Sequence, residues 1–296
     1  MADLKLADNR LALGTVQFGL PYGVANKKGQ INPEEARIIL EKAWTAGVDT
    51  LDTAMDYGES ELRLGGIGVK QWKIVTKLSP IPKDCTDLEA WVNRSVCASI
   101  EKLKVPQLQG LLLHQPQQLL CPQGKELFRV LKSIKDQGKI KKIGVSVYDT
   151  EELDALWPLY QLDLVQIPFN IFDRRLVSSG WLKKLHSAGT EVHVRSVFLQ
   201  GLLLMSVTDR PKKFNRWQPL WDQWQNWLAK HETTPLNACL GFAFSHPEID
   251  RVIVGVDSLA HLLEILDCIK VPVAIPPEDI RSIDKDLINP SCWSHF

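Results

Sequence analysis

Eight short apolar runs rich in β-branched residues recur along the chain, and longer segments with the period of an amphipathic helix separate them. The expected strands are Leu11–Thr15, Val48–Asp52, Lys73–Lys77, Leu108–His114, Ile140–Val145, Leu164–Ile167, Glu191–Arg195 and Arg251–Gly255. Parallel strands need long crossovers, and the segments between these runs supply them. The pattern therefore predicts an α/β fold with a single domain over residues 1–296, a (β/α)8 TIM barrel, with an open doubly wound sheet as the alternative.

Local signals agree with this alternation. The segment Pro33–Ala46 predicts a helix that Asn32 caps and Gly47 ends. No G-x-G-x-x-G follows the first expected strand and no G-x-x-x-x-G-K-[ST] occurs anywhere, which disfavours a doubly wound nucleotide-binding sheet. A separate group of glycines is expected to form a turn: Gly65, Gly66 and Gly68.

Charge and composition narrow the class of partner. Among the 296 residues, 35 basic and 35 acidic side chains cancel, so neither nucleic acid nor an anionic membrane is an expected partner. The first residues lack the apolar core of a secretory signal, and no apolar stretch is long enough to span a bilayer, so we expect a cytoplasmic protein with a small-molecule partner. Nothing in the chain indicates its oligomeric state. The scattered cysteines are expected to be free thiols: Cys85, Cys97, Cys121, Cys239, Cys268 and Cys292.

Two segments are expected to extend the barrel. One covers about 205–231 and carries four tryptophans at helical spacing, Trp217, Trp221, Trp224 and Trp227. This stripe predicts either an accessory helix packed against the barrel wall or an aromatic wall for a substrate. The other is the tail, about 276–296, whose aromatic end Cys292-Trp293-Ser294-His295-Phe296 is expected either to fold back over a barrel mouth or to be disordered.

Four polar residues stand where expected strands end and loops begin: Asp52, Tyr57, Lys77 and His114. A free tyrosine has a pKa of about 10, and a lysine ammonium within hydrogen-bond reach of its hydroxyl would lower that pKa. Asp52 would hold the ammonium, and His114 would either donate a hydrogen bond to a carbonyl oxygen or pass a proton to Tyr57. Such a site could protonate an oxygen while a hydride is delivered to the carbonyl carbon, which predicts carbonyl reduction.

These residues and their context closely resemble the aldo-keto reductases. The segments that carry the resemblance are GVDTLDTAMDYGESE, VTKLS and LLLHQP, with Leu13-Gly14-Thr15, Ile143-Gly144-Val145-Ser146, Val165-Gln166 and Leu199-Gln200-Gly201-Leu202-Leu203 in support. The resemblance covers nearly the whole chain. It implies a TIM barrel that binds NADP(H) or NAD(H) across its C-terminal mouth and reduces an aldehyde or ketone to an alcohol.

The resemblance also implies roles. Tyr57 would be the general acid, Lys77 and Asp52 would tune it, and His114 would orient the carbonyl. On the cofactor side, Ser146 and Gln166 would hold the nicotinamide carboxamide, and the other cofactor contacts would include Gly14, Thr15, Asp52 and Arg195. On the substrate side, Gln17 and Tyr22 would join Tyr57 and His114.

Two positions depart from the family pattern. Val147 stands where the family usually has an asparagine, so one amide hydrogen bond to the cofactor would be missing. Arg195 stands where the family commonly stacks an aromatic ring on the nicotinamide. A guanidinium can also stack, but its charge could select an anionic substrate, alter the grip on the cofactor, or be taken up by an ion pair.

The remaining cofactor contacts are expected at two loops. Ser196 to Leu202, with Phe198 and Gly201, would hold the pyrophosphate. The adenosine end would meet Gly255, Val256, Asp257 and Ser258, followed by His261 and Glu264. Only His261 there could be positive, and Asp257 would repel a 2′-phosphate, so we expect a weakened preference for NADP(H) and plausible use of NAD(H). His261 and Glu264 have no third ligand nearby, and no metal is expected.

Other functions remain open at this point. One alternative is a regulatory or sensor protein that keeps the fold and binds the cofactor with little turnover. Another is a lyase or epimerase that uses Tyr57 as a base. The substrate is expected to be a polar, sugar-like or acidic carbonyl compound.

Overall fold

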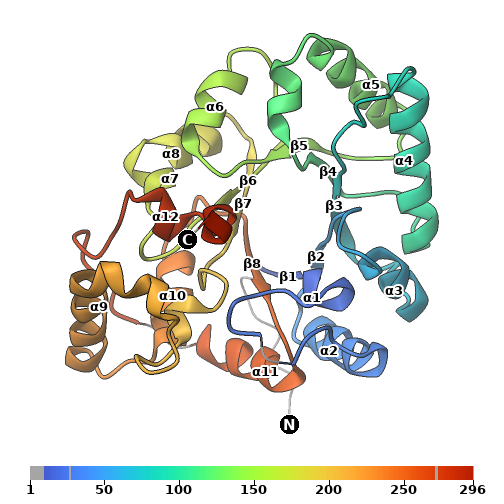
Figure 1. Ribbon diagram of the computed structural model, residues 1–296. Helices are drawn as coiled ribbons and strands as arrows, with labels where there is room; N and C mark the ends of the chain where they lie inside the picture. Colours follow the sequence, from blue (N-terminus) through green and yellow to red (C-terminus); the bar gives the residue numbers. More distant parts are fainter. Residues whose placement is uncertain (1–9, 27, 271–272, 296) are drawn as a thin grey trace.

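The computed structural model describes residues 10–26, 28–270 and 273–295. In these residues, eight parallel strands pair in chain order and close into a barrel, since β1 also pairs with β8 through Leu11 and Val252 (Figure 1). The strands are β1 (Leu11–Gly14), β2 (Thr50–Asp52), β3 (Lys73–Leu78), β4 (Gly110–Leu113), β5 (Ile143–Ser146), β6 (Leu164–Pro168), β7 (Glu191–Arg195) and β8 (Arg251–Gly255). The predicted barrel is confirmed, and the open sheet is wrong because β1 and β8 are not edges.

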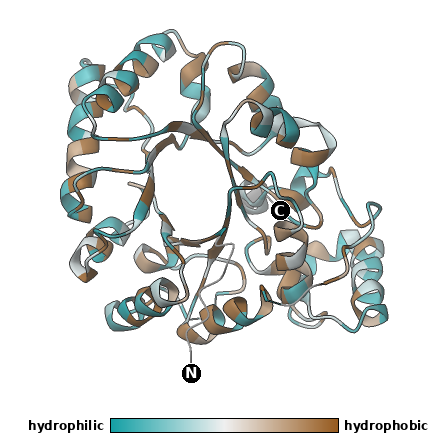
Figure 2. Ribbon diagram, turned by 180° about the vertical axis from the view of Figure 1, so that it is seen from behind, coloured by the Kyte–Doolittle hydropathy of each residue, from teal (hydrophilic) through white to brown (hydrophobic). Residues whose placement is uncertain are grey.

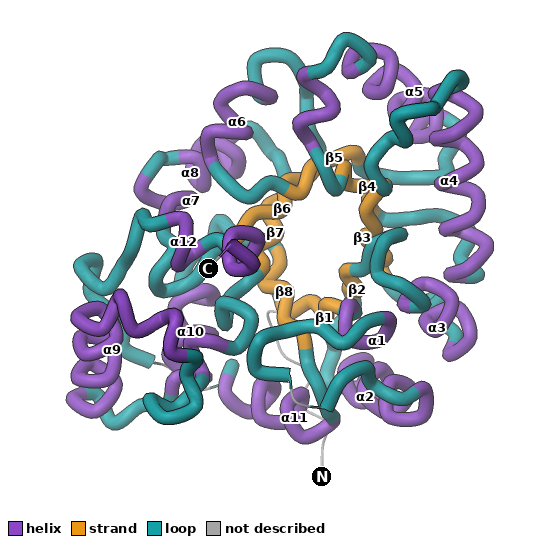
Figure 3. The backbone as a smooth tube through the Cα atoms, viewed as in Figure 1, coloured by secondary structure: helices purple, strands orange, loops and turns teal. Residues whose placement is uncertain are grey.

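Helices surround the strands as an outer ring (Figure 3). They are α1 (Val16–Gly19), α2 (Pro33–Thr45), α3 (Ser60–Ile67), α4 (Leu88–Leu103), α5 (Gly124–Asp136), α6 (Thr150–Leu156), α7 (Arg175–Ser178), α8 (Trp181–Ser187), α9 (Gln218–Lys230), α10 (Pro235–Phe244), α11 (Leu259–Cys268) and α12 (Lys285–Ile288). Short 3-10 turns lie at Pro116–Leu120, Leu202–Leu204, Lys212–Trp217 and Pro290–His295. None of the helices within the described ranges is long and apolar enough to cross a membrane.

Helix α2 begins and ends where its sequence predicts. The Asn32 side chain accepts a hydrogen bond from the Glu35 amide, and Pro33 occupies the first turn. Gly47 adopts a φ of 90°, a left-handed conformation that side-chain-bearing residues avoid. The helix is one residue shorter than predicted, and the strand ends differ from their predicted positions by at most a few residues.

The glycines after Tyr57 show why glycine alone does not predict a turn. Gly65 and Gly66 lie inside α3, so the turn prediction is wrong for both. A Cβ built on Gly65 would lie 1.9 Å from the carbonyl oxygen of Lys102 in α4, so the two helices approach too closely for a side chain. Gly68 does leave the helix, with a φ of 98°.

Apolar residues fill two zones. Hydrophobic helix faces turn toward the strands, and hydrophilic faces turn outward (Figure 2). Inside the barrel, Val75, Leu112 and Leu164 form a separate buried cluster. Val75 and Lys77 are two residues apart on β3, so they share one face of the strand. An apolar floor therefore lies beneath the polar end of the barrel.

The tryptophan stripe belongs to the core. Trp221 and Trp224 of α9 are fully buried, and their ring centroids lie 4.8 Å and 6.5 Å from that of Phe172. Trp224 also stacks on Trp227 at 5.8 Å. The packing prediction is confirmed. The substrate-wall alternative is wrong, because none of these rings, nor Trp217, lines the cavity described below.

The described part of the C-terminal tail is folded back onto loops at the carboxyl ends of the strands (Figure 1). The Trp293 ring packs on Phe214 at 4.8 Å, and Lys285 Nζ lies 2.8 Å from an Asp149 carboxylate oxygen. The tail borders the barrel mouth without lining the cavity there. Phe296, the last residue of the aromatic end named in the sequence analysis, lies outside the described residues. The cysteines named above are all free, as predicted.

Candidate active site

The four predicted residues meet in one cavity of about 770 Å³ at the carboxyl ends of the strands. Asp52 ends β2, Lys77 lies near the end of β3, and His114 directly follows β4. Tyr57 stands in the turn between β2 and α3. In a parallel barrel the carboxyl ends of all strands share one face, which is why residues far apart in the sequence gather there.

Lys77 and Asp52 form a buried ion pair at the base of this cavity. Lys77 is 1% exposed, and its Nζ donates to both Asp52 oxygens, at 2.9 Å and 2.7 Å, and to the carbonyl oxygen of Thr53 at 2.9 Å. Three acceptors require three N–H groups, so the geometry is that of the charged ammonium. Burial lowers the pKa of Lys77, and the Asp52 carboxylate opposes that shift.

Tyr57 is held as a neutral phenol. Burial is the main cause that raises its pKa above the ordinary value; the Asp52 charge acts in the same direction, and Arg195 acts against both. Lys77 Nζ lies 5.0 Å from the centre of the Tyr57 ring, but its three donors are already used. The expectation that Lys77 hydrogen-bonds the phenol is therefore wrong for this arrangement, in which lysine faces the ring, and the pKa of Tyr57 is raised overall rather than lowered.

His114 contacts both Tyr57 and a carboxylate that sequence reasoning missed. Its ring meets Tyr57 edge to face at 5.9 Å, and its Nδ1 lies 3.3 Å from Asp56 Oδ2. Burial and then Lys77 lower the pKa of His114, while Asp56 opposes them, so the ring is mainly neutral at pH 7. With a neutral ring, a proton on Nδ1 facing Asp56 leaves Nε2 as an acceptor. Asp56 was detectable only as the neighbour of Tyr57.

A chain of hydrogen bonds links the expected carboxamide site to the Lys77–Asp52 ion pair. Ser146 Oγ donates to Gln166 Oε1 at 3.0 Å, and Gln166 Nε2 donates to Asp52 Oδ1 at 2.6 Å. The Gln166 amide keeps one N–H and one lone pair for a ligand, which fits a carboxamide. Val147 is fully buried and does not line the cavity, so the family's asparagine has no polar substitute at that position.

Arg195 points its charge at the same cavity. Its Nη2 donates to the carbonyl of Val147 at 3.0 Å, and the guanidinium lies 4.5 Å from the centre of the Tyr148 ring. The ion-pair alternative is wrong: among the described residues, no carboxylate pairs with Arg195. Sequence reasoning missed Tyr148, although it stands two residues after β5, where a barrel places its functional side chains.

The cavity continues to the N-terminal end of α11, where Gly255, Asp257, His261 and Glu264 line it. Two predicted cofactor residues do not: Val256 is buried, and Ser258 caps the helix by accepting from the His261 amide at 3.3 Å.

Asp257 is close to more than one basic side chain. Burial raises its pKa, while His261, Lys28 and a hydrogen bond from Gln17 oppose that shift. His261 is therefore not the only group there that can be positive, because the loop between α1 and α2 brings Lys28 near.

The other predicted contacts line the cavity as well: Gly14, Thr15, Gln17, Tyr22, Ser196, Phe198 and Gly201. Tyr22, which follows α1, reaches the loop after β7, where its Oη accepts from Gln200 Nε2 at 2.9 Å. Gly201 has a φ of 88°, and a Cβ there would lie 2.4 Å from Ala25 Cβ. Sequence reasoning missed this crossing, because it joins loops with no pattern in common.

These residues fit an extended dinucleotide. One cavity runs from the spare carboxamide-binding groups of Ser146 and Gln166 to the helix N-terminus at α11, and its volume is in the range typical of ligand sites. The Gln17 side chain adds a buried Oε1 that has no hydrogen-bond partner among the described residues.

Comparison with known proteins identifies the family of the chain. The model of the aldo/keto reductase family matches residues 10–287. An aldo-keto reductase of Bacillus subtilis, YhdN, is 27% identical over 192 residues, which are 60% of this chain and 55% of that protein. A D-threo-aldose 1-dehydrogenase of a Pseudomonas species is 25% identical, with 86% of this chain and 89% of that protein covered.

Two further relatives extend the comparison. An NADH-specific methylglyoxal reductase of Escherichia coli is 23% identical, with 83% of this chain and 85% of that protein covered. The fold matches that of an aldo-keto reductase from Bacillus halodurans in its holo form, with a TM-score of 0.70, 17% identity, and coverage of 92% of this chain and 90% of that one. The family model covers nearly the whole barrel, and the chain is an oxidoreductase of the aldo/keto reductase family.

Proposed function

We propose that the protein reduces an aldehyde or ketone to an alcohol with a nicotinamide cofactor, and that Tyr57 is the proton donor. The observation that carries the proposal is a buried, neutral phenol next to an immobilised ammonium–carboxylate pair, in a cavity that also reaches the N-terminus of α11. A bound nicotinamide supplies the hydride that adds to the carbonyl carbon.

Tyr57 then donates its proton to the carbonyl oxygen, where negative charge develops. The raised pKa keeps the phenol protonated but makes it a weaker acid, so donation depends on the negative charge that develops on the carbonyl oxygen. Lys77, with its Nζ 5.0 Å from the ring centre, supplies positive charge that stabilises the phenolate left behind. Asp52 and the Thr53 carbonyl hold this ammonium in place.

The contact between His114 and Asp56 restricts both roles expected of His114. A neutral ring with its proton on Nδ1 has a lone pair on Nε2, so Nε2 can accept a hydrogen bond but can donate neither to the substrate carbonyl nor to Tyr57. His114 would fill either role through Nε2 only in its protonated form, which its lowered pKa disfavours at pH 7.

NADH use is part of the proposal. Asp257 lies at the end of the cavity where the 2′-phosphate of NADPH would bind, and its charge would repel that phosphate. The E. coli relative is named NADH-specific, which supports the same choice. Lys28 and His261 offset part of the repulsion, so we expect NADPH to bind, but without a preference of about tenfold or more. A cytoplasmic location remains a prediction.

The test compares Tyr57→Phe with the wild type in single-turnover oxidation of NADH by a panel of small aldehydes. We expect the variant to react about 100-fold more slowly or worse, with a dissociation constant for NADH, followed by tryptophan fluorescence, within a few fold of wild type. Tyr160→Phe is the matched control, because Tyr160 donates to the Leu119 carbonyl away from the cavity.

Three outcomes separate the candidate functions. Cofactor binding without turnover in the wild type would favour the sensor alternative. Unchanged turnover in Tyr57→Phe would reject the assigned role. A product formed without net cofactor oxidation would favour a lyase or an epimerase.

A further inference from the structure

Arg195 is a cation in the candidate active site without an acidic partner among the described residues. It ends β7, is partly buried, and lines the same cavity as Tyr57 and His114. Its hydrogen bonds go to the carbonyl of Val147 at 3.0 Å and, more weakly, to Ser196 Oγ at 3.4 Å. A guanidinium has five N–H donors, so most of them remain for a ligand.

The other charged groups near Tyr57 are engaged by partners other than Arg195. Lys77 is paired with Asp52. Both oxygens of Asp56 are engaged, Oδ1 by the Ser79 hydroxyl and Oδ2 by His114. Burial raises the pKa of both Tyr57 and Tyr22, and the Arg195 charge opposes that shift in each, so its field reaches the groups that would surround a substrate. An anionic ligand would balance this charge.

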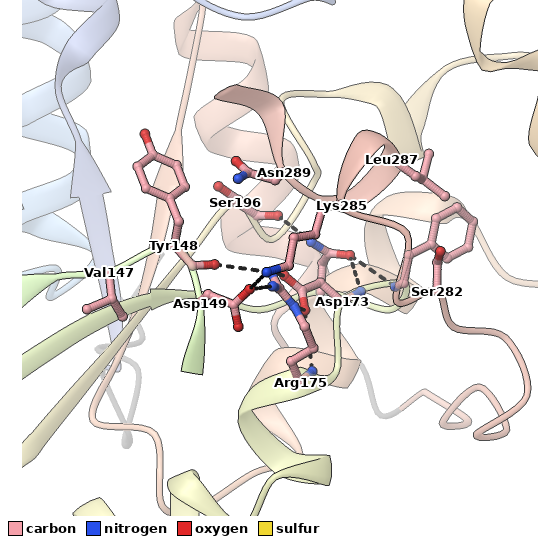
Figure 4. Close-up of polar contacts among 12 residues, drawn as sticks. Val147, Tyr148, Asp149, Asp173, Arg175, Ser196, Ser282, Lys285, Leu287 and Asn289 are labelled. Carbon is pink, nitrogen blue, oxygen red and sulfur yellow. Dashed lines mark hydrogen bonds and ion pairs between the residues drawn. The ribbon is translucent and has the colours of Figure 1, made fainter. Parts of the chain in front are cut away.

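The guanidinium is also held in one orientation. It lies over the Tyr148 ring at 4.5 Å. The backbone that carries this ring is fixed in turn, because Arg175 Nη2 donates to the Tyr148 carbonyl at 3.1 Å and Nη1 to Asp149 at 2.6 Å (Figure 4). Lys285 of the C-terminal tail adds a contact of 2.8 Å to Asp149. A pre-oriented guanidinium loses little freedom when it binds a planar anion.

We infer that Arg195 binds a carboxylate of the carbonyl substrate, so that the substrate is an aldehyde or ketone acid rather than a neutral carbonyl compound. This inference rests on the proposed reduction at Tyr57. The stacked Tyr148 and the Val147 carbonyl position the guanidinium, which makes charge-assisted hydrogen bonds with the acid group. A phosphate of the cofactor carries the same kind of charge, and the experiment separates the two sources.

The test uses matched substrates that differ in the charge of one group: the meta and para isomers of formylbenzoate and of formylbenzamide. We expect the wild type to prefer the acid of at least one pair by about tenfold or more in kcat/KM, since hydrogen bonds to charged groups are the strong ones. In Arg195→Gln the ratio of acid to amide for that pair should fall about tenfold, mainly through KM. Arg195→Lys, which keeps the charge but not the fork, should retain part of the ratio.

Because the comparison uses the ratio of kcat/KM for the acid to that for the amide, any effect of Arg195→Gln that both substrates share cancels. Arg129→Gln, on the exposed face of α5, is the control and should leave the ratio unchanged. Equal acid and amide rates in the wild type would overturn the inference, as would an unchanged ratio in Arg195→Gln. Weaker binding of NADH, with the acid-to-amide ratio unchanged, would assign Arg195 to the cofactor instead.

The experiment distinguishes failure of the Arg195 inference from failure of the proposed reduction at Tyr57. If the amides are reduced through Tyr57 but no acid is preferred, the reductase function stands and the Arg195 inference fails. If neither series is reduced while NADH binds, both fail together.

Discussion

His193 lies inside the barrel on β7, and its protonation is linked to folding. It is 1% exposed; its Nε2 lies 2.7 Å from Glu191 Oε1, and its Nδ1 has no partner among the described residues. Because the neutral ring donates its one N–H to the carboxylate, a second proton would create a buried donor without an acceptor. Burial lowers the pKa of His193 to about 3, and Arg251 and Lys142 act in the same direction.

This depressed pKa predicts acid sensitivity. In the unfolded chain the histidine has a pKa of about 6.5, whereas in the folded protein its pKa is about 3. Between these two pH values the unfolded chain binds a proton at His193 and the folded protein does not. Stability from His193 is therefore fully present above about pH 6.5 and is lost as the pH falls. Between about pH 8 and pH 5 the loss from this one group is about 2 kcal/mol. His193→Gln keeps an N–H donor for Glu191 and removes the titrating group.

Urea unfolding followed by tryptophan fluorescence at the two pH values measures this difference. We expect the free energy of unfolding of the wild type to fall by about 2 kcal/mol more than that of His193→Gln. His186→Gln, on the exposed face of α8, should behave like the wild type. An equal pH dependence in wild type and His193→Gln would refute the reasoning.

Three other predictions concern the ion pair, the cofactor end and the helix contact. Lys77→Met leaves Asp52 as an unpaired buried carboxylate and should lower the free energy of unfolding by about 3–5 kcal/mol in urea titrations, whereas a double variant with Asp52→Asn should recover part of it. Asp257→Asn should tighten NADPH about threefold more than NADH in fluorescence titrations, because a repulsive charge is lost, and equal shifts would contradict its placement. Gly65→Ala must push α3 from α4 and lower Tm, while Gly66→Ala, with open space around its Cβ, should raise stability by up to about 1 kcal/mol; a stable Gly65→Ala would contradict the close approach.

Local patterns in the sequence predict the barrel and several of the residues that meet in its candidate active site. Alternating periods place the strands, and parallel strands bring Asp52, Lys77 and His114 to one face because each stands at a strand end. The side-chain partners do not follow in this way. Whether Lys77 donates to Tyr57 or to Asp52 and the Thr53 carbonyl depends on distances of a few ångströms, which residue spacing does not fix.

Contacts between loops could not be predicted from the sequence either. Tyr22 reaches Gln200 in the loop after β7, and Lys28 lies near Asp257. Such crossings depend on the paths of two irregular segments, each without a period of its own. Gly65 is a related case. A glycine is needed there because α3 and α4 cross too closely for a side chain, and not because the chain turns.

Hydride transfer from the cofactor to a carbonyl carbon is the central claim, and isotope transfer tests it most directly. The purified protein would be incubated with a carbonyl substrate and NADH carrying deuterium at the transferable position of its nicotinamide ring, in separate samples for the two faces. The account predicts that mass spectrometry of the alcohol finds one deuterium on the former carbonyl carbon for one face only. Oxidation of NADH with no deuterium in the alcohol from either sample, or no alcohol at all while NADH binds, would contradict it.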